Sequence, residues 1–229
     1  MKRLFTDFDG PIMDVSERYF QVYQFCLQKV KEPNQVITPL TKSEFWELKR
    51  SQIPEKEIAL KSGLNLVNQA QNFARLRREN INAKHFFAYD RLHPWAINAL
   101  ETAQDYGFDL AVVTMRREWE LYPVLTHYNL HKFFKSDRIF CLKNDYIKTQ
   151  DIKDKPQLMA QAIATLSHSQ NQWMIGDTEA DLVAGNTHNI ATIAVLSGIR
   201  NQTQLALYQP QSIAQDLQAA IEIIINSSN

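Results

Sequence analysis

Residues 171–198 read NQWMIGDTEADLVAGNTHNIATIAVLSG, and this stretch decides the fold. Its two apolar runs, QWMIG and ATIAVLSG, each end at a glycine, as expected where a buried strand is followed by a tight loop. Between the runs, Asp177 and Asp181 follow Gly176 at a predicted strand-to-helix junction. The stretch therefore predicts two buried strands with carboxylates at the end of the first.

The same pattern recurs along the chain. Apolar runs at 4–10 (LFTDFDG), 108–114 (FDLAVVT) and 138–142 (RIFCL) predict further strands. Helix-period segments follow or precede them at 93–106, 118–128 and 156–166. Alternating strands and helices predict an α/β fold with a doubly wound, mainly parallel sheet, whose ligands bind beyond the carboxyl ends of the strands.

One long segment, residues 14–88, interrupts this alternation with helical patterning and no convincing strand. Three helices are expected there: one from Val15 to Val30, one after Pro39 with a capping box, and one from Leu66 to about Asn80. We therefore predict a core domain of residues 1–13 and 89–229 and a smaller inserted helical domain of residues 14–88.

Two local features of these helices carry further predictions. The capping box of the second inserted helix joins Thr41 to Glu44. The tail after Gln211 predicts one more helix that packs on the core, because its apolar residues share one face; they are Ile213, Leu217, Ile221, Ile224 and Ile225.

The composition narrows the class of protein. The chain has 229 residues, 45% of them hydrophobic and 22% charged, which is typical of a folded globular protein. The formal net charge is zero, so neither nucleic acid nor an anionic membrane is an expected partner. Cys26 and Cys141 form no zinc or disulfide pattern, and no signal peptide or membrane span is evident. A cytoplasmic monomer or dimer is expected.

Two pairs of aspartates lie at predicted strand ends. Asp7 and Asp9 point to the same side of a strand, so they either repel each other or share a cation such as Mg²⁺, unless both are solvated in a loop. Asp177 and Asp181 are four apart and share a helix face. Asp177 is expected to bind a cation and Asp181 to hold a water or orient Lys155; the alternative is helix capping by Asp177 or Thr178.

Two further strand-end positions suit a phosphate. Thr114 is expected to end its strand, where its hydroxyl can donate to a phosphate oxygen, although many strands end in Thr for ordinary turn reasons. Lys155 precedes Pro156, a residue that favours the first turn of a helix, so its ammonium group is expected at a helix start. The alternative for Lys155 is a plain surface lysine.

Together, the order and spacing of DFDG near residue 10, Thr114, Lys155-Pro156 and GDTEAD near residue 177 resemble the haloacid-dehalogenase-like hydrolase superfamily. The likeness is greatest to its phosphoglycolate-phosphatase-like branch, and it covers nearly the whole chain. It implies a Rossmann-like core with the helical insert as the family's cap domain.

The resemblance also implies residue roles in a phosphatase that acts on a small phosphorylated metabolite. Asp7 is implied as the nucleophile, Asp9 as the acid and base, and Lys155 as the third catalytic residue. The implied magnesium ligands are Asp7, the backbone carbonyl of Asp9 and Asp177, with Asp181 behind them. Substrate binding is implied for Thr114, Met115 and Arg116.

The sequence departs from the family pattern at Pro11 and at Met115-Arg116-Arg117. The two arginines either bind a second anionic group of a substrate or are exposed and pair with Glu118 or Glu120. Three other functions stay open. They are a phosphosugar mutase of the same fold, a protein that binds a phosphorylated ligand without turnover, and a receiver-like signalling module, which the long helical insert disfavours.

Overall fold

The computed structural model describes residues 2–65 and 67–227. The chain divides into two compact units. The core unit comprises Met1–Asp14, Leu92–Gly198 and Gln202–Asn229, and the helical unit comprises Val15–Arg91 and Ile199–Asn201.

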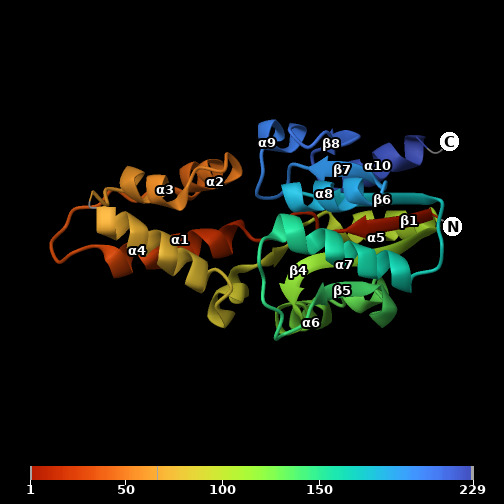
Figure 1. Ribbon diagram of the computed structural model, residues 1–229, viewed down its shortest axis with the longest axis horizontal. Helices are drawn as coiled ribbons and strands as arrows, with labels where there is room; N and C mark the ends of the chain where they lie inside the picture. The colour runs from red at the N-terminus through yellow and green to blue at the C-terminus, as the bar shows by residue number, and fades with distance from the viewer. Residues whose placement is uncertain (1, 66, 228–229) are drawn as a thin grey trace. The chain divides into compact units, whose positions relative to one another are not determined.

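A six-stranded sheet forms the centre of the core unit, in the order β5-β4-β1-β6-β7-β8 (Figure 1). All neighbouring strands are parallel, which confirms the predicted class of fold. The strands are β1 (Lys2–Thr6), β4 (Phe108–Arg117), β5 (Ile139–Leu142), β6 (Asn171–Gly176), β7 (Ala191–Val195) and β8 (Ser212–Ala214). At the carboxyl end of β1, Thr6 lies opposite Val112 of β4 and Ile175 of β6. The residues that follow these positions therefore lie at the same edge of the sheet.

Helices cover both faces of this sheet, since the consecutive residues Leu4 and Phe5 of β1 are both fully buried. The helices of this unit are α5 (Ala96–Asp105), α6 (Glu118–His127), α7 (Asp151–Thr165), α8 (Glu179–Thr187), α9 (Gln202–Ala206) and α10 (Leu217–Ser227), with short 3-10 turns η2 (Leu130–Lys132) and η3 (Ser136–Arg138). In Figure 1, α7 and α8 lie together in front of the sheet. They bury Phe5, Val113 and Met174 in one apolar cluster, while α5 and α10 pack against each other.

The helical unit contains α1 (Ser16–Val30), α2 (Lys42–Arg50), α3 (Glu55–Lys61), α4 (Val67–Asn80) and the 3-10 turn η1 (Lys84–Tyr89). Its core is aromatic: the rings of Tyr23 and Phe45 stack with their centroids 4.6 Å apart, and Phe73 packs edge-on against Tyr23. The predicted capping box is confirmed, since Thr41 and Glu44 bond reciprocally at the start of α2. Among the described residues, no helix has both the length and the apolar sequence needed to cross a bilayer.

Two short strands, β2 (Met13–Asp14) and β3 (Arg91–Leu92), form a separate two-stranded sheet. Helix α3 was absent from the sequence prediction, although Pro54 and two glutamates mark its first turn. The prediction of a single helix after Gln211 was also partly wrong. Ile213 lies in β8, and the helix begins at Leu217, because Ser212–Ala214 pairs with β7 as a sixth parallel strand.

Two predicted boundaries near the site were wrong. Strand β4 does not end at Thr114 but continues to Arg117, with a shift in its pairing with β5 between Val113 and Arg117. Helix α7 begins at Asp151, so Lys155 lies inside it and not at its start.

The early start of α7 has a local cause. Asp154 accepts hydrogen bonds from both the backbone N–H and the hydroxyl of Thr149, at 2.8 and 2.7 Å. The backbone N–H groups of Lys153 and Asp154 bond to the carbonyl of Gln150. These bonds start the helix upstream of Pro156, which is accommodated within the helix although it lacks an N–H.

Candidate active site

Asp7 follows the last residue of β1, at the carboxyl edge of the sheet. Its backbone N–H donates to the carbonyl of Ile175, which extends the pairing of β1 with β6 by one residue. One carboxylate oxygen, Oδ1, accepts the N–H of Phe8 at 2.7 Å, and the other, Oδ2, lies 2.8 Å from Nζ of Lys155. Each oxygen of this buried carboxylate therefore has a partner, and its orientation is fixed.

Lys155 is almost fully buried, with 1% of its surface exposed, and it pairs with both Asp7 and Asp181. Burial by itself lowers the pKa of an ammonium group. Here the carboxylates of Asp181 and Asp7 outweigh burial and raise the pKa of Lys155 above its ordinary value, so it remains charged. The alternative of a plain surface lysine is wrong.

Burial instead disfavours the charged form of Asp7. Burial raises its pKa to about 7, against the attraction of Lys155 and with further repulsion from Asp181 and Asp9. A cation bound beside Asp7 would oppose this rise. In this setting the charged form of the Asp7 carboxylate depends on nearby positive charge.

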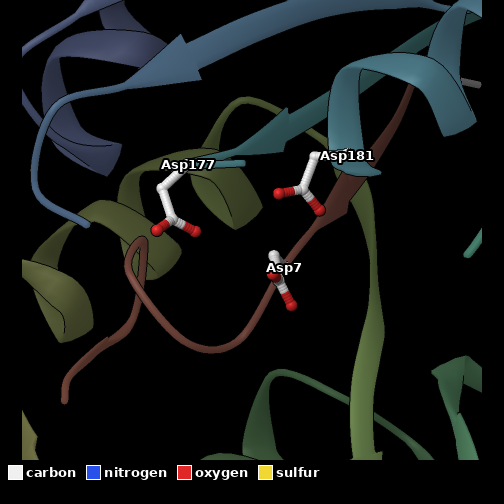
Figure 2. A group of neighbouring side chains, drawn as sticks. All are labelled: Asp7, Asp177 and Asp181. Atoms are coloured by element: carbon white, nitrogen blue, oxygen red, sulfur yellow. The ribbon is translucent and has the colours of Figure 1, made fainter. Parts of the chain in front are cut away.

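Asp7, Asp177 and Asp181 lie together at this edge (Figure 2). Each offers a carboxylate oxygen, these atoms lie within 4.8 Å of one another, and all three residues are buried. Three hard oxygen donors suit Mg²⁺, and a buried acidic cluster of this kind is costly without a cation. The residues present therefore fit a metal ion.

The surroundings of Asp177 give a second indication that its position is specific. Gly10 and Gly198 approach its carboxylate so closely that a Cβ atom on either residue would overlap it. Gly10 also has a φ of +90°, which favours glycine. The hydroxyl of Ser197, next to Gly198, donates to the carbonyl of Gly10 at 2.8 Å, so a hydrogen bond joins the two glycine loops beside Asp177.

Asp181 has two roles, and only its contact with Lys155 was predicted, because helix capping was expected of Asp177 or Thr178. Its Oδ2 accepts the backbone N–H and the hydroxyl of Thr178, at 3.0 and 2.7 Å, and so caps the start of α8. Its Oδ1 pairs with Lys155. Helix capping and contact with the site thus occur together in one carboxylate.

Thr114 and Met115 lie on opposite sides of β4. Thr114 is buried, and its hydroxyl oxygen accepts the backbone N–H of Arg116 at 3.3 Å. Met115 packs its side chain against the apolar cluster under α7 and α8. The side chains of Thr114 and Arg116 therefore lie on the same face of β4, and that of Met115 lies on the other face.

Arg116 was expected to be exposed if it did not bind substrate, and this is wrong. It is buried, and its Nε and Nη2 lie 2.8 and 2.6 Å from Oδ1 of Asp9. Arg117, by contrast, lies 3.6 Å from the carboxylate of Glu120. The period of two along β4 places Thr114 and Arg116 on one side, a signal missed because the strand was ended too early.

The structure thus brings together Asp7, Lys155, Asp177 and Asp181, and it pairs Asp9 with Arg116 beside them. Phe8, Ser197 and Gly198 also belong to this site, although they were not predicted from the sequence. Gly198 carried a signal, because it ends an apolar run in a chain with only six glycines. Phe8 and Ser197 carried none, since they act through a backbone N–H and a contact between distant loops.

Comparison with known proteins gives a family match over part of the chain. Residues 153–220 match the HAD-hydrolase-like family. Pyrophosphatase PpaX of Oceanobacillus iheyensis is 24% identical over 135 residues, which span 58% of this chain and 60% of that protein. The chain thus covers less than two thirds of this curated relative.

Solved structures agree over nearly the full chain. A predicted phosphatase from Clostridium acetobutylicum has a TM-score of 0.69 at 20% identity, with 98% of each chain covered. A haloacid-dehalogenase-like hydrolase from Streptococcus pneumoniae has a TM-score of 0.67 at 20% identity, again with 98% of each covered. These likenesses establish the fold, and with the family match they confirm the resemblance seen in the sequence. Over residues 153–220 the chain is thus similar to the HAD-hydrolase-like family, and its fold is that of solved haloacid-dehalogenase-like proteins.

Proposed function

We propose that the protein is a Mg²⁺-dependent phosphatase that hydrolyses a small phosphomonoester through an aspartyl-phosphate on Asp7. One observation carries this proposal: a buried lysine, Lys155, pairs with Asp7 at the end of the central strand, beside the acidic residues Asp177 and Asp181. The arrangement combines a fixed carboxylate nucleophile with fixed positive charge, which phosphoryl transfer requires.

In the first step, a carboxylate oxygen of Asp7 attacks phosphorus, and the bond from phosphorus to the alcohol oxygen breaks. Asp9 donates a proton to the departing oxygen, so the alcohol leaves neutral. The hydrogen bond from Phe8 N–H and the contact with Lys155 hold the Asp7 carboxylate in place for this attack. Lys155 also offsets charge on the phosphoryl oxygens.

In the second step, water attacks the phosphorus of the aspartyl-phosphate, and Asp9 takes its proton. The bond from phosphorus to the Asp7 oxygen breaks, which releases inorganic phosphate, restores the Asp7 carboxylate and leaves Asp9 protonated for the next cycle. Thr114, buried at the same edge, is assigned to a phosphate oxygen, together with backbone groups of Met115 and Arg116.

The acidic residues account for the metal requirement. Asp7, Asp177 and the backbone carbonyl of Asp9 are assigned as ligands, with Asp181 holding Lys155 or a metal-bound water. When bound, Mg²⁺ supplies positive charge that neutralises the transferring phosphoryl group. Asp7 and Asp177 are held for this role by Lys155 and by the two glycine loops.

We assign the helical unit as the cap domain of this fold. Its own aromatic core and buried ion pair between Arg18 and Asp90, at 2.8 Å, support a unit that is internally rigid. In this proposal the helical unit has the role of a lid, a kind of domain that commonly selects the substrate.

The test is phosphate release from a panel of phosphorylated metabolites, inorganic pyrophosphate and p-nitrophenyl phosphate, with Mg²⁺ or EDTA. We expect release by the wild type that requires Mg²⁺ and is abolished by Asp7→Asn. Asp109→Asn is the matched control, because Asp109 is a core-unit aspartate paired with Arg3 and Arg138 near the amino end of β4.

Two outcomes contradict the proposal. Conversion of a hexose 1-phosphate to the 6-phosphate without free phosphate identifies a mutase. Binding of phosphorylated compounds with no release from any panel member identifies a ligand-binding protein.

A further inference from the structure

Arg116 is held on three sides in the core unit. Its Nε and Nη2 contact Oδ1 of Asp9, its Nη1 donates to the carbonyl of Glu120 at 3.3 Å, and its guanidinium carbon lies 5.1 Å from the centre of the Phe8 ring. The residue is 3% exposed. A buried arginine fixed in this way has little freedom to reach elsewhere.

Asp9, unlike Arg116, is partly exposed. It follows the nucleophile by two residues in a loop, and 31% of its side chain is exposed. Both arginine nitrogens converge on its Oδ1, a geometry that fixes the direction of the carboxylate as well as its distance. Asp9 is therefore a partly exposed carboxylate anchored to a buried, rigid cation.

We infer that Arg116 is a positioning residue that holds the Asp9 carboxylate in the place from which it exchanges a proton with the leaving group. This rests on the proposed function, in which Asp9 is the acid and base. The positioning role takes the place of the earlier alternative, in which Arg116 binds a second anionic group of the substrate. The guanidinium is already engaged with Asp9, Glu120 and Phe8.

The inference predicts a dependence on the leaving group. An alkyl alcohol needs a proton as it departs, whereas p-nitrophenolate leaves without one, so misplacing the acid slows only the alkyl ester in the first step. The parameter to compare is kcat/KM, because it reports the steps up to release of the alcohol and excludes hydrolysis of the aspartyl-phosphate.

We would measure kcat/KM for the best alkyl ester of the panel and for p-nitrophenyl phosphate in Arg116→Met and Arg116→Lys. For Arg116→Met we expect a loss of about 10- to 100-fold with the alkyl ester, the size of effect that a misplaced catalytic group produces, and less than about threefold with p-nitrophenyl phosphate. Lysine keeps the charge but not the planar fork, so Arg116→Lys should recover only part of the rate.

A double-mutant cycle tests whether Arg116 acts through Asp9. Asp9→Asn should show the same preference for the activated ester, and adding Arg116→Met to it should cause no further loss. Arg138→Met is the matched control, because Arg138 also holds an aspartate, Asp109, through Nε at 2.7 Å, near the amino end of β4. It should leave both kcat/KM values within about twofold, since this pair lies near the amino end of β4 and away from the carboxyl edge that carries the site.

The outcomes separate this inference from the proposed function. An equal loss with both esters, a gain with the alkyl ester, or losses that multiply in the double variant would each overturn the positioning role while leaving the phosphatase intact. If the wild type hydrolyses no ester at all, the phosphatase proposal fails and the role of Arg116 falls with it. Thermal unfolding of each variant identifies any loss that comes from misfolding.

Discussion

The ammonium nitrogen of Lys155 lies 2.8 Å from Oδ2 of Asp7, and the same nitrogen pairs with Asp181. One buried cation therefore faces two carboxylates, and Asp177 adds a third in the same cluster. Since these charges are removed from water, the balance between them affects the stability of the core as well as its chemistry.

Replacing Lys155 by methionine should destabilise the protein, because it leaves two buried carboxylates without their cation. We expect a loss of about 3–5 kcal/mol in the free energy of unfolding, together with loss of phosphatase activity. Urea unfolding in EDTA measures the first effect. Lys148→Met is the control, since Lys148 is more exposed and should contribute at most about 1 kcal/mol. Equal unfolding midpoints for the two variants would contradict the prediction.

Gly198→Ala should displace the carboxylate of Asp177, because a Cβ atom would overlap it. We expect the Mg²⁺ concentration for half-maximal phosphate release to rise by roughly 10- to 100-fold, the range seen when groups that orient metal ligands are altered. Gly107→Ala serves as the control. Gly107 has a φ of +77° but no atom near its Cβ position, so this variant should lose about 1 kcal/mol of stability and keep its Mg²⁺ dependence.

His93 should make stability depend on pH below its ordinary pKa of 6.5. Burial lowers the pKa of His93 below the ordinary 6.5, against the opposing effects of Asp14, the Gly10 carbonyl and Asp216. In this range the unfolded chain binds the additional proton, so stability is complete above pH 6.5 and is lost as pH falls toward the folded pKa.

The measurement is the difference in urea midpoint between the wild type and His93→Gln at each pH. The contributions of the other titrating groups cancel in this difference. The wild type should lose more stability on acidification than the variant. Parallel pH profiles would show that His93 takes up its proton equally in both states.

Both cysteines should react slowly with iodoacetamide at neutral pH. Burial raises the pKa of Cys26 and of Cys141 to about 11, so nearly all of each thiol is protonated at pH 7.5. Mass spectrometry should show little alkylation of folded protein and rapid labelling in urea. Fast labelling of either cysteine in the folded protein would indicate a thiolate that this environment does not favour.

Sequence reasoning identified the class of fold because its signals are local and repeated. The strands of the core sheet are short apolar runs, and those at Phe5, Val113 and Met174 meet in one cluster as the alternation implies. The sixth strand, Ser212–Ala214, was missed because three residues carry too little pattern to distinguish a strand from the first turn of a helix.

The site was harder to predict than the fold. Aspartates at strand ends pointed to one edge of the sheet, and Asp7, Asp177 and Asp181 do lie together there. The burial of Lys155 within α7 and the pairing of Arg116 with Asp9 could not be predicted, because each depends on partners supplied by distant strands. Helix α7 starts through hydrogen bonds between Thr149 and Asp154, and these two residues match no helix-start motif that was recognised in the sequence.

The central position of β1 has a consequence for how the protein folds. Its neighbours in the sheet are β4 and β6, which lie far along the chain, so β1 can pair only after long loops have closed. The helices of the inserted unit instead contact partners within one continuous segment, and such local contacts form quickly. We therefore expect refolding to be biphasic, with helical signal recovered before Asp7 meets Lys155 and enzymatic competence regained last.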